Sequence, residues 1–242
     1  MTKETMLPGM RDYIGREWRD RLDTYARRNR GKYLGFARFI EPVHYSAEEV
    51  YRRATFSILS VQSPFDRACE VYHVVVGLTQ AQRNDFDVLR VAVASLLYAP
   101  MKATGLLLLV EQVRKDHRLY LRDPELDYTL PGAWDLYRRR LAREVFGLGK
   151  AKGSFLACLL YPLEADLACL DTWILRRFGF PPEKNGHLTW PEYLGAEVQI
   201  RKLARKWDVS TFIAQWIIWD CDRGQTEDHS VLGMPGAHKD RD

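Results

Sequence analysis

Apolar side chains recur at a helical period along nearly the whole chain, and this pattern restricts it to an all-helical fold. In the stretch 12–28, for example, large apolar residues stand about 3.6 residues apart among charged ones, which is typical of an amphipathic surface helix. The one run rich in β-branched residues, 71–76, follows Ser63-Pro64, where Ser63 is expected as the N-cap and Pro64 as the first helical residue. Because the chain has neither a convincing period-two strand nor an internal repeat, we expect an all-α protein of about ten helices.

Capping signals mark where the helices begin. Ser46 with Glu49, and Thr79 with Gln82, have the spacing of a capping box, in which the N-cap and the third helical residue satisfy each other's backbone N–H groups. Pro100 is expected to end the helix that follows Thr79. The expected helices cover 12–28, 46–61, a segment from 63 onward, 79–99, 101–115, 133–146, 151–160, 170–178, 189–207 and 210–220.

Composition excludes several classes of protein. Hydrophobic residues make up 46% of the 242 residues and charged residues 28%, so global disorder is excluded. The formal charge of +4 gives only weak support to an anionic partner. Four cysteines, none in a C-x-x-C pair, fit reduced thiols in a cytosolic protein better than a zinc or iron–sulfur site. Since the chain has no membrane-length apolar run and the stretch 1–12 has no signal-peptide pattern, we expect a soluble cytoplasmic protein without metal or cofactor.

The most informative motif lies at 145–154, where the sequence reads VFGLGKAKGS. A basic helix ends, a Gly-Leu-Gly turn follows at 147–149, and a second helix begins at once. Glycines permit a left-handed backbone and the close approach of a phosphate, and the free N–H groups at a helix start bind anions. Lys150 and Lys152 add positive charge. A Walker A loop is excluded because no Gly-Lys-Ser/Thr has the required offset, whereas a helix C-cap that binds nothing is the alternative interpretation.

Two further elements accompany this turn in a defined order. About twenty residues beyond it, Asp171 and Thr172 open an Arg-rich helix, and upstream a helix ends in Ser-Val-Gln at Gln62. Together the three pieces resemble the helix-hairpin-helix DNA glycosylase superfamily, whose best-known members are similar to endonuclease III. The resemblance covers roughly 46–179 and, more loosely, the helices up to residue 220.

The resemblance implies a two-lobed all-α fold with duplex DNA bound across an interlobe cleft. The corresponding divisions are an N-terminal helix and lead-in packed on the second lobe (1–45), a six-helix-type lobe (46–130), a hairpin-containing lobe with the catalytic aspartate and the C-terminal helices (131–224), and a flexible tail (225–242).

Asp171 matches the essential aspartate of the superfamily, which stabilises an oxocarbenium-like sugar or activates the nucleophile that attacks C1′. At a helix N-terminus its pKa is expected to stay low, so that it is ionised; a plain N-cap is the alternative. Gln62 matches a position near the flipped base or in the gap that the base leaves. A polar residue at a helix end is the alternative there.

The chain departs from the bifunctional relatives at their lyase lysine. That residue lies four positions after the first hairpin glycine, which is Ala151 here, with Lys150 and Lys152 on either side. Because one residue turns a helical side chain by about 100°, neither lysine can be assumed to reach C1′, and Schiff-base lyase chemistry is doubtful. The four-Cys cluster loop of endonuclease III is absent as well.

The candidate site residues fall into three sets. The catalytic candidates are Asp171 and Lys152. The residues expected to bind DNA are Gly147, Leu148, Gly149, Lys150, Lys152, Gly153, Ser154 and Arg143, with Arg138, Arg139 and Arg140 as further phosphate contacts or a solvated helix face. Gln62 and Trp173 are expected in the base pocket or inserted into the duplex. Trp190, Trp207, Trp216 and Trp219 are expected in the core rather than stacked on a base.

The preferred function is a monofunctional DNA glycosylase that flips a modified or damaged base and cleaves its N-glycosidic bond. An alternative is a glycosylase-like transferase of the kind bacteriophages are thought to use for thymine hypermodification, with glycine or putrescine as co-substrate. A second alternative is a DNA-binding module without chemistry. The expected partner is duplex DNA, bound by a monomer in a bacterial or phage-infected cell.

Overall fold

The computed structural model describes residues 16–42, 44–178 and 188–223, and every regular element in them is helical. The helices are α1 (Arg16–Ile40), α2 (Ala47–Leu59), α3 (Phe65–Val76), α4 (Gln80–Arg83), α5 (Phe86–Ala92), α6 (Ala99–Asp116), the 3-10 helix η1 (His117–Tyr120), α7 (Ala133–Glu144), α8 (Lys150–Leu160), α9 (Thr172–Arg177), α10 (Trp190–Trp207) and α11 (Thr211–Arg223). The expected all-α class is thereby confirmed. The proposed tail at 225–242 lies outside the described residues.

Two of the expected caps are formed as the sequence indicates. The Ser46 hydroxyl accepts a hydrogen bond from the Glu49 backbone N–H at 3.2 Å, which begins α2. Thr79 and Gln82 form a reciprocal capping box at the start of α4. In both places a local side-chain acceptor satisfies an N–H group that the helix leaves free.

The helix expected over 12–28 continues to Ile40 as α1, and three further expected boundaries are wrong. Pro64, not Ser63, is the N-cap of α3, and it has no side-chain cap. The single helix expected over 79–99 is divided because the Asp85 carboxylate caps a new helix, α5, by accepting from the N–H groups of Asp87 and Val88. Pro100 lies in the first turn of α6 instead of ending a helix, since proline has no N–H to lose there.

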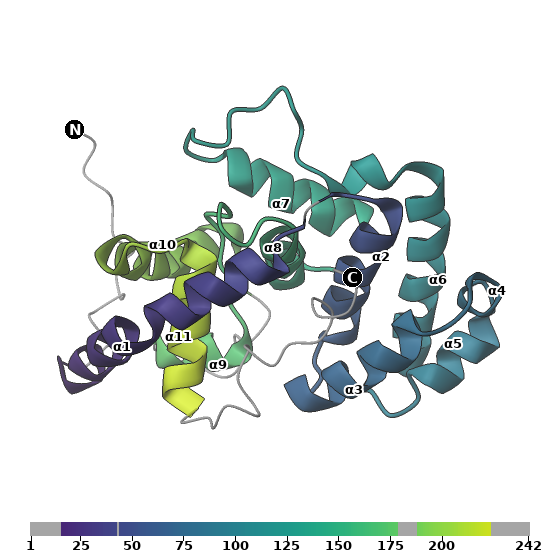
Figure 1. The fold of residues 1–242 in the computed structure, drawn as a ribbon, viewed down its shortest axis with the longest axis horizontal. Coiled ribbons are helices and arrows are strands. Elements are labelled where there is room, and N and C mark those ends of the chain that lie inside the picture. The colour runs from purple at the N-terminus through teal and green to yellow at the C-terminus, as the bar shows by residue number, and fades with distance from the viewer. Residues whose placement is uncertain (1–15, 43, 179–187, 224–242) are drawn as a thin grey trace.

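The helices form two groups with α7 and α8 between them (Figure 1). In one group, α2 packs against α3 and α6, and α5 packs against α6. In the other, α1 crosses α11 and also contacts α10, which in turn packs on α11. The long N-terminal helix is therefore part of the second group rather than an independent unit.

Helix α8 is the central element of the core. All residues from Gly153 to Leu160 are buried, and α8 packs against α7 on one side and α2 on the other. A helix that is apolar all round is expected in the interior. Its first turn, which follows the Gly-Leu-Gly turn, is the part that reaches the surface.

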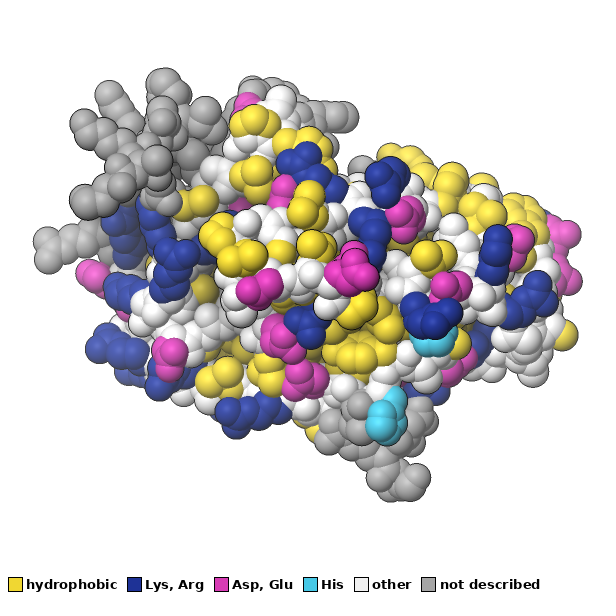
Figure 2. Space-filling model, turned by 90° about the horizontal axis from the view of Figure 1, so that it is seen from above, with side chains coloured by type: hydrophobic (Ala, Val, Ile, Leu, Met, Phe, Trp, Pro, Cys, Tyr) yellow, Lys and Arg dark blue, Asp and Glu magenta, His cyan; other side chains and the backbone are white. Residues whose placement is uncertain are grey.

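The outer surface mixes both signs of charge. Seen from above, acidic and basic side chains are interspersed, and Lys and Arg gather toward the end where α1 and α10 lie (Figure 2). None of the helices in the described residues is long and apolar enough to cross a membrane.

Candidate nucleic-acid interface and active site

The turn between α7 and α8 has one left-handed residue, not two. Gly147 has φ +79°, so a side chain there would be strained. Gly149 has φ −90° and ψ −170°, an extended conformation that any residue adopts, and the expectation of positive φ at both glycines is wrong. Leu148 between them is buried and fixes the turn to the core.

Gly149 is the N-cap of α8 and offers no side-chain acceptor to the first N–H groups of the helix. A Cβ atom added at Gly147 or Gly149 would meet nothing within 4 Å. Backbone N–H groups at a helix start that have no side-chain cap are suited to bind an anion.

Two residues expected to bind DNA are instead buried between helices. The Ser154 side chain is 0% exposed, donates to the Lys150 carbonyl at 3.0 Å, and accepts from Arg138 Nη1 at 3.2 Å. A Cβ on Gly153 would lie 3.2 Å from the Arg138 carbonyl oxygen, so this glycine allows α7 and α8 to pack closely. Neither residue can reach a phosphate, which corrects the expectation for both.

The arginines of α7 divide in the same way. Arg138 is 0% exposed and pairs with Glu197 at 2.8 Å, so it is not a phosphate contact. Arg140 donates to the Leu121 carbonyl. Arg139 pairs with Asp135 and lies over a tryptophan ring. Arg139 and Arg143 keep outward positions, with side chains 42% and 76% exposed, and Arg143, next to the hairpin, pairs with its neighbour Glu144.

The two hairpin lysines point in different directions. Lys150 donates to the Leu188 carbonyl, and its Nζ lies 5.1 Å from the centre of the Trp190 ring. Lys152 is close enough to the Asp171 carboxylate to lower its pKa electrostatically. Of the two lysines, Lys152 is the one whose charge acts on the aspartate.

Asp171 is the N-cap of α9 and at the same time faces the interior of the protein. Its Oδ1 accepts from the Ile174 N–H at 2.8 Å. Burial raises the pKa of Asp171 above its ordinary value, and hydrogen bonds from the Ile174 N–H and the Trp219 side chain, together with the Lys152 charge, oppose that shift. The expected low pKa is therefore wrong: the helix start lowers it, but desolvation is the larger effect.

Aromatic rings adjoin this aspartate. Trp219 bonds Asp171 and lies 5.3 Å, centre to centre, from Phe65 at the start of α3. Lys152 Nζ lies 5.1 Å from the Phe155 ring centre. Trp219 is 9% exposed and lies in the core as expected. Its side chain also belongs to the candidate site, because it bonds Asp171. A lone tryptophan in a helical pattern gives no signal of that.

The segment that leads into Asp171 is clamped by side chains from α10 and α11, a feature that no motif in the sequence indicates. Glu197 Oε1 accepts from the Ala168 N–H at 2.7 Å, and Tyr193 donates to the Ala168 carbonyl at 2.7 Å. The Gln215 side-chain amide accepts from the Cys169 N–H at 2.5 Å and donates to its carbonyl at 2.8 Å. These bonds fix the backbone just before the aspartate.

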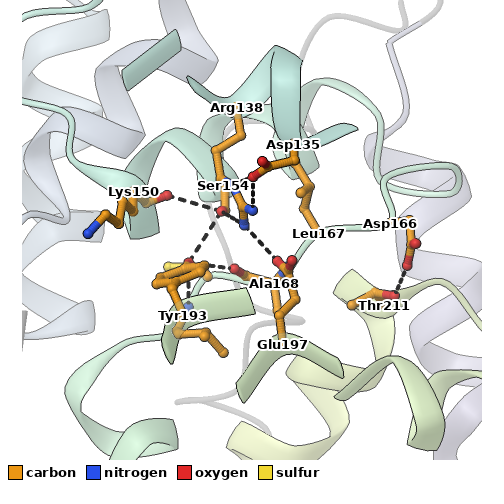
Figure 3. A network of polar contacts seen from close by, with 12 residues as sticks. Asp135, Arg138, Lys150, Ser154, Asp166, Leu167, Ala168, Tyr193, Glu197 and Thr211 are labelled. Carbon is orange, nitrogen blue, oxygen red and sulfur yellow. Dashed lines mark hydrogen bonds and ion pairs between the residues drawn. The ribbon is translucent and has the colours of Figure 1, made fainter. Parts of the chain in front are cut away.

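Arg138 joins this clamp to the hairpin helix. Figure 3 shows its guanidinium between Asp135, Ser154 and Glu197, with Tyr193 bonded to Ser154 on the other side. One buried network therefore connects α7, α8 and α10 around the backbone that carries Asp171.

Three further candidate side chains, from both helix groups, are exposed. Gln62, in the turn between α2 and α3, is exposed and has φ +48°, and Tyr98, just before α6, is 55% exposed with φ +59°. Trp173, two residues after the aspartate, is 39% exposed. Positive φ is uncommon for such residues and marks positions worth testing for function. The sequence singled out Gln62 and Trp173 but missed Tyr98.

Comparison with known proteins identifies the fold. No protein-family model matches the chain, and no curated protein matches its sequence. The 8-oxoguanine DNA glycosylase of Thermotoga maritima matches with a TM-score of 0.68 and 16% identity, over 86% of this chain and 97% of its own. That of Methanocaldococcus jannaschii matches with a TM-score of 0.66 and 13% identity, over 89% and 99%.

A third match is the Methanocaldococcus jannaschii 8-oxoguanine glycosylase/lyase in complex with a 15mer DNA containing 8-oxoguanine. Its TM-score is 0.59 and its identity 18%, over 88% of this chain and 95% of that chain. The resemblance expected from the hairpin and Asp171 is confirmed at the level of fold: this chain has the all-helical fold of the helix-hairpin-helix DNA glycosylases.

Proposed function

We propose that this protein is a DNA glycosylase that binds duplex DNA through the turn at 147–149 and excises a flipped base with Lys152 and Asp171. The observation that carries the proposal is that Lys152 and Asp171 border the same cluster of aromatic rings. Lys152 Nζ lies 5.1 Å from the Phe155 ring centre, Trp219 bonds Asp171, and Phe56 and Phe65 connect the Phe155 and Trp219 rings. Lys152 also belongs to α8, the helix whose start forms the proposed anion site. The phosphate-binding turn and Lys152 are then one helical turn apart, so a bound phosphate would position the sugar beside Lys152 and Asp171.

The chemistry follows from the two charges. The base leaves C1′ with the electron pair of the N-glycosidic bond, and the sugar develops positive charge that the Asp171 carboxylate stabilises. Lys152 is half-buried in the first turn of α8, with its Nζ 5.1 Å from the Phe155 ring centre, and a lysine amine can act as the nucleophile of a covalent mechanism. The neutral Lys152 amine would form a bond to C1′ as the base departs, and the proton that the amine gives up would pass to the base. The C1′–O4′ bond would then break, and O4′ would take the second proton of the amine, which leaves a Schiff base. This revises the monofunctional hypothesis that the offset of Ala151 suggested.

The flipped base would be held by the aromatic residues beside Asp171. Trp219 and Phe65 come from α11 and α3, that is, from the two helix groups, and planar rings stack on bases with little sequence preference. Because the three similar structures are named as 8-oxoguanine glycosylases, duplex DNA with 8-oxoguanine is the first substrate to test.

The deciding experiment is borohydride trapping on this duplex together with mass spectrometry of the released bases. We expect base release and a trapped covalent adduct for the natural protein, and neither for Lys152→Gln. Lys150→Gln is the matched control, because it removes the neighbouring lysine of the same helix and is expected to keep the adduct. Base release without an adduct would restore the monofunctional interpretation.

The other two hypotheses give distinct outcomes in related assays. Duplex DNA with 5-phosphomethyluracil is incubated with glycine or putrescine, and a mass gain on thymine would indicate the transferase instead. Tight binding with no product on any duplex would indicate a binding module without chemistry. Either result would overturn the proposed glycosylase.

A further inference from the structure

Two non-glycine residues of the helical lobe have a left-handed backbone, and both are next to the same buried lysine. They are Gln62 (φ +48°) and Tyr98 (φ +59°). The remaining non-glycine residue with positive φ in the described chain is Asp208, at the C-cap of α10, where aspartate tolerates this conformation. Glutamine and tyrosine do so less readily, so the surroundings must hold them there.

Lys102 provides that restraint at both positions. Its Nζ donates to the Val61 carbonyl at 2.6 Å and to the Leu97 carbonyl at 2.6 Å. Each carbonyl belongs to the peptide bond that joins its residue to the left-handed one, Val61 to Gln62 and Leu97 to Tyr98. One ammonium group therefore fixes two peptide planes, and with them the φ angles that follow.

A buried ammonium is an expensive way to satisfy two carbonyls. Lys102 is 1% exposed, and its burial, together with the nearby Lys152 charge, lowers its pKa to about 8. A buried charge contributes little to stability in general, and its best-attested use is to specify one arrangement of the groups around it. The arrangement specified here is that of two turns.

Gln62 and Tyr98 are both exposed, so the core gains nothing from their conformations. The helix that carries Lys102 passes close to the hairpin, since a Cβ on Gly105, three residues further along α6, would lie 3.5 Å from the Phe146 carbonyl oxygen just before Gly147. The lysine and its two turns therefore belong to the part of the lobe near the hairpin. A polar and an aromatic side chain held rigid there are suited to contact bases of a duplex.

We propose that Lys102 is a positioning residue that holds Gln62 and Tyr98 in left-handed conformations and thereby presents their side chains to duplex DNA. The restraint itself is a property of the free protein. Its use on DNA rests on the proposed function, so the two parts need separate measurements.

The first measurement is amide hydrogen exchange of the free protein with Lys102→Met. We expect exchange of the N–H groups of residues 62–63 and 98–99 to accelerate by about tenfold or more, because the turns lose their common anchor. Lys115→Met, the same change at an exposed lysine of α6, is the control and should leave these amides unchanged. Unchanged exchange in a folded Lys102→Met protein would overturn the proposal. If that variant does not fold, Lys102→Gln, whose amide keeps an N–H donor, replaces it.

The second measurement uses a duplex with 2-aminopurine beside the target base, whose fluorescence rises when the base is unstacked. We expect Lys102→Met and Gln62→Ala to reduce the rise about equally, and the double variant to be no worse than either, since both act through one side chain. Affinity for undamaged duplex should stay within about twofold, because the hairpin supplies it. The proposal would be overturned if the fluorescence rose fully with Lys102→Met but not with Gln62→Ala. If no duplex gives a rise even with the natural protein, the proposed function fails, while the exchange experiment still decides the restraint.

Discussion

Replacing the two hairpin glycines one at a time should separate the stability of the turn from its grip on DNA. Gly147 has φ +79°, and a side chain in the left-handed region costs roughly 1–2 kcal/mol. Gly149 has an extended backbone and open space around its Cα, so alanine there costs nothing and gains about 0.4–1 kcal/mol by restricting the unfolded chain.

For a chain of this size, 1 kcal/mol corresponds to a change of about 2–4 °C in Tm. Gly147→Ala is therefore expected to lower Tm by about 2–8 °C, and Gly149→Ala to leave it unchanged or raise it slightly. Differential scanning calorimetry at one pH and salt concentration measures both.

Binding should respond differently from stability. A methyl group on Gly149 stands in the space where a phosphate would approach the first N–H groups of α8. We expect Gly149→Ala to weaken binding to undamaged duplex by about tenfold, equivalent to about 1.4 kcal/mol, regardless of sequence. Fluorescence anisotropy at low salt measures this change.

Two results would contradict the reasoning. If Gly149→Ala binds DNA as tightly as the natural protein, no phosphate approaches the start of α8, and the anion site is wrong. If Gly147→Ala melts at the same temperature as the natural protein, the left-handed turn is not needed. The pair also serves as its own control, because the same Ala substitution is made two residues apart.

Three further predictions concern the buried network and the aspartate. Arg138→Met removes one of the two arginines that pair with the fully buried Glu197 and leaves Arg201 at 3.0 Å, so it is expected to destabilise the fold by about 3 kcal/mol, the lower end for a broken buried pair, in chemical denaturation. Gly153→Ala places a Cβ 3.2 Å from the backbone oxygen of Arg138 and should cost about 1–3 kcal/mol in the same assay; a neutral result would show that α7 can shift. Because burial raises the pKa of Asp171, base excision should fall off with acid at a higher pH than an ordinary aspartate gives. Because an ionised Asp171 is disfavoured in the folded state, the contribution of Asp171 to stability is lost as the pH rises through its folded pKa. Asp171→Asn should therefore be as stable as the natural protein, or more stable, near pH 7. Its turnover should nevertheless drop about a hundredfold.

Local signals in the sequence predicted local features well. Ser46 and Thr79 form the expected caps because their partners lie three residues away, and the turn at 147–149 joins two helices as expected. The N-cap predicted at Ser63 was wrong because the next residue, Pro64, is itself the N-cap of α3. The break at Asp85 was missed because a helical apolar period continued across it, although aspartate is a strong N-cap.

The direction in which a side chain points could not be predicted in the same way. Arg138 and Arg143 both belong to a basic helix next to the hairpin, but Arg138 is buried because Glu197, which lies 59 residues away, neutralises it, whereas Arg143 is exposed. Ser154 follows the hairpin as a phosphate contact would, but packing of α7 on α8 removes it from the surface. Such outcomes depend on tertiary partners that spacing along the chain does not specify.

The same distinction between spacing and tertiary contacts applies to the two hairpin lysines. Counting from Gly147 assigns the family's lysine position to Ala151, and that count concerns only where each Cα lies around the helix. A lysine has a flexible stem of four carbons, so its ammonium can be found well away from the direction its Cα suggests. What decides between Lys150 and Lys152 is the competition for each charge. The Leu188 carbonyl and the Trp190 ring hold Lys150, whereas the charge of Lys152 acts on the Asp171 carboxylate. Under the proposed function, Lys152 is therefore the lysine available for chemistry, and Lys150 supports the hairpin through its bond to the Leu188 carbonyl.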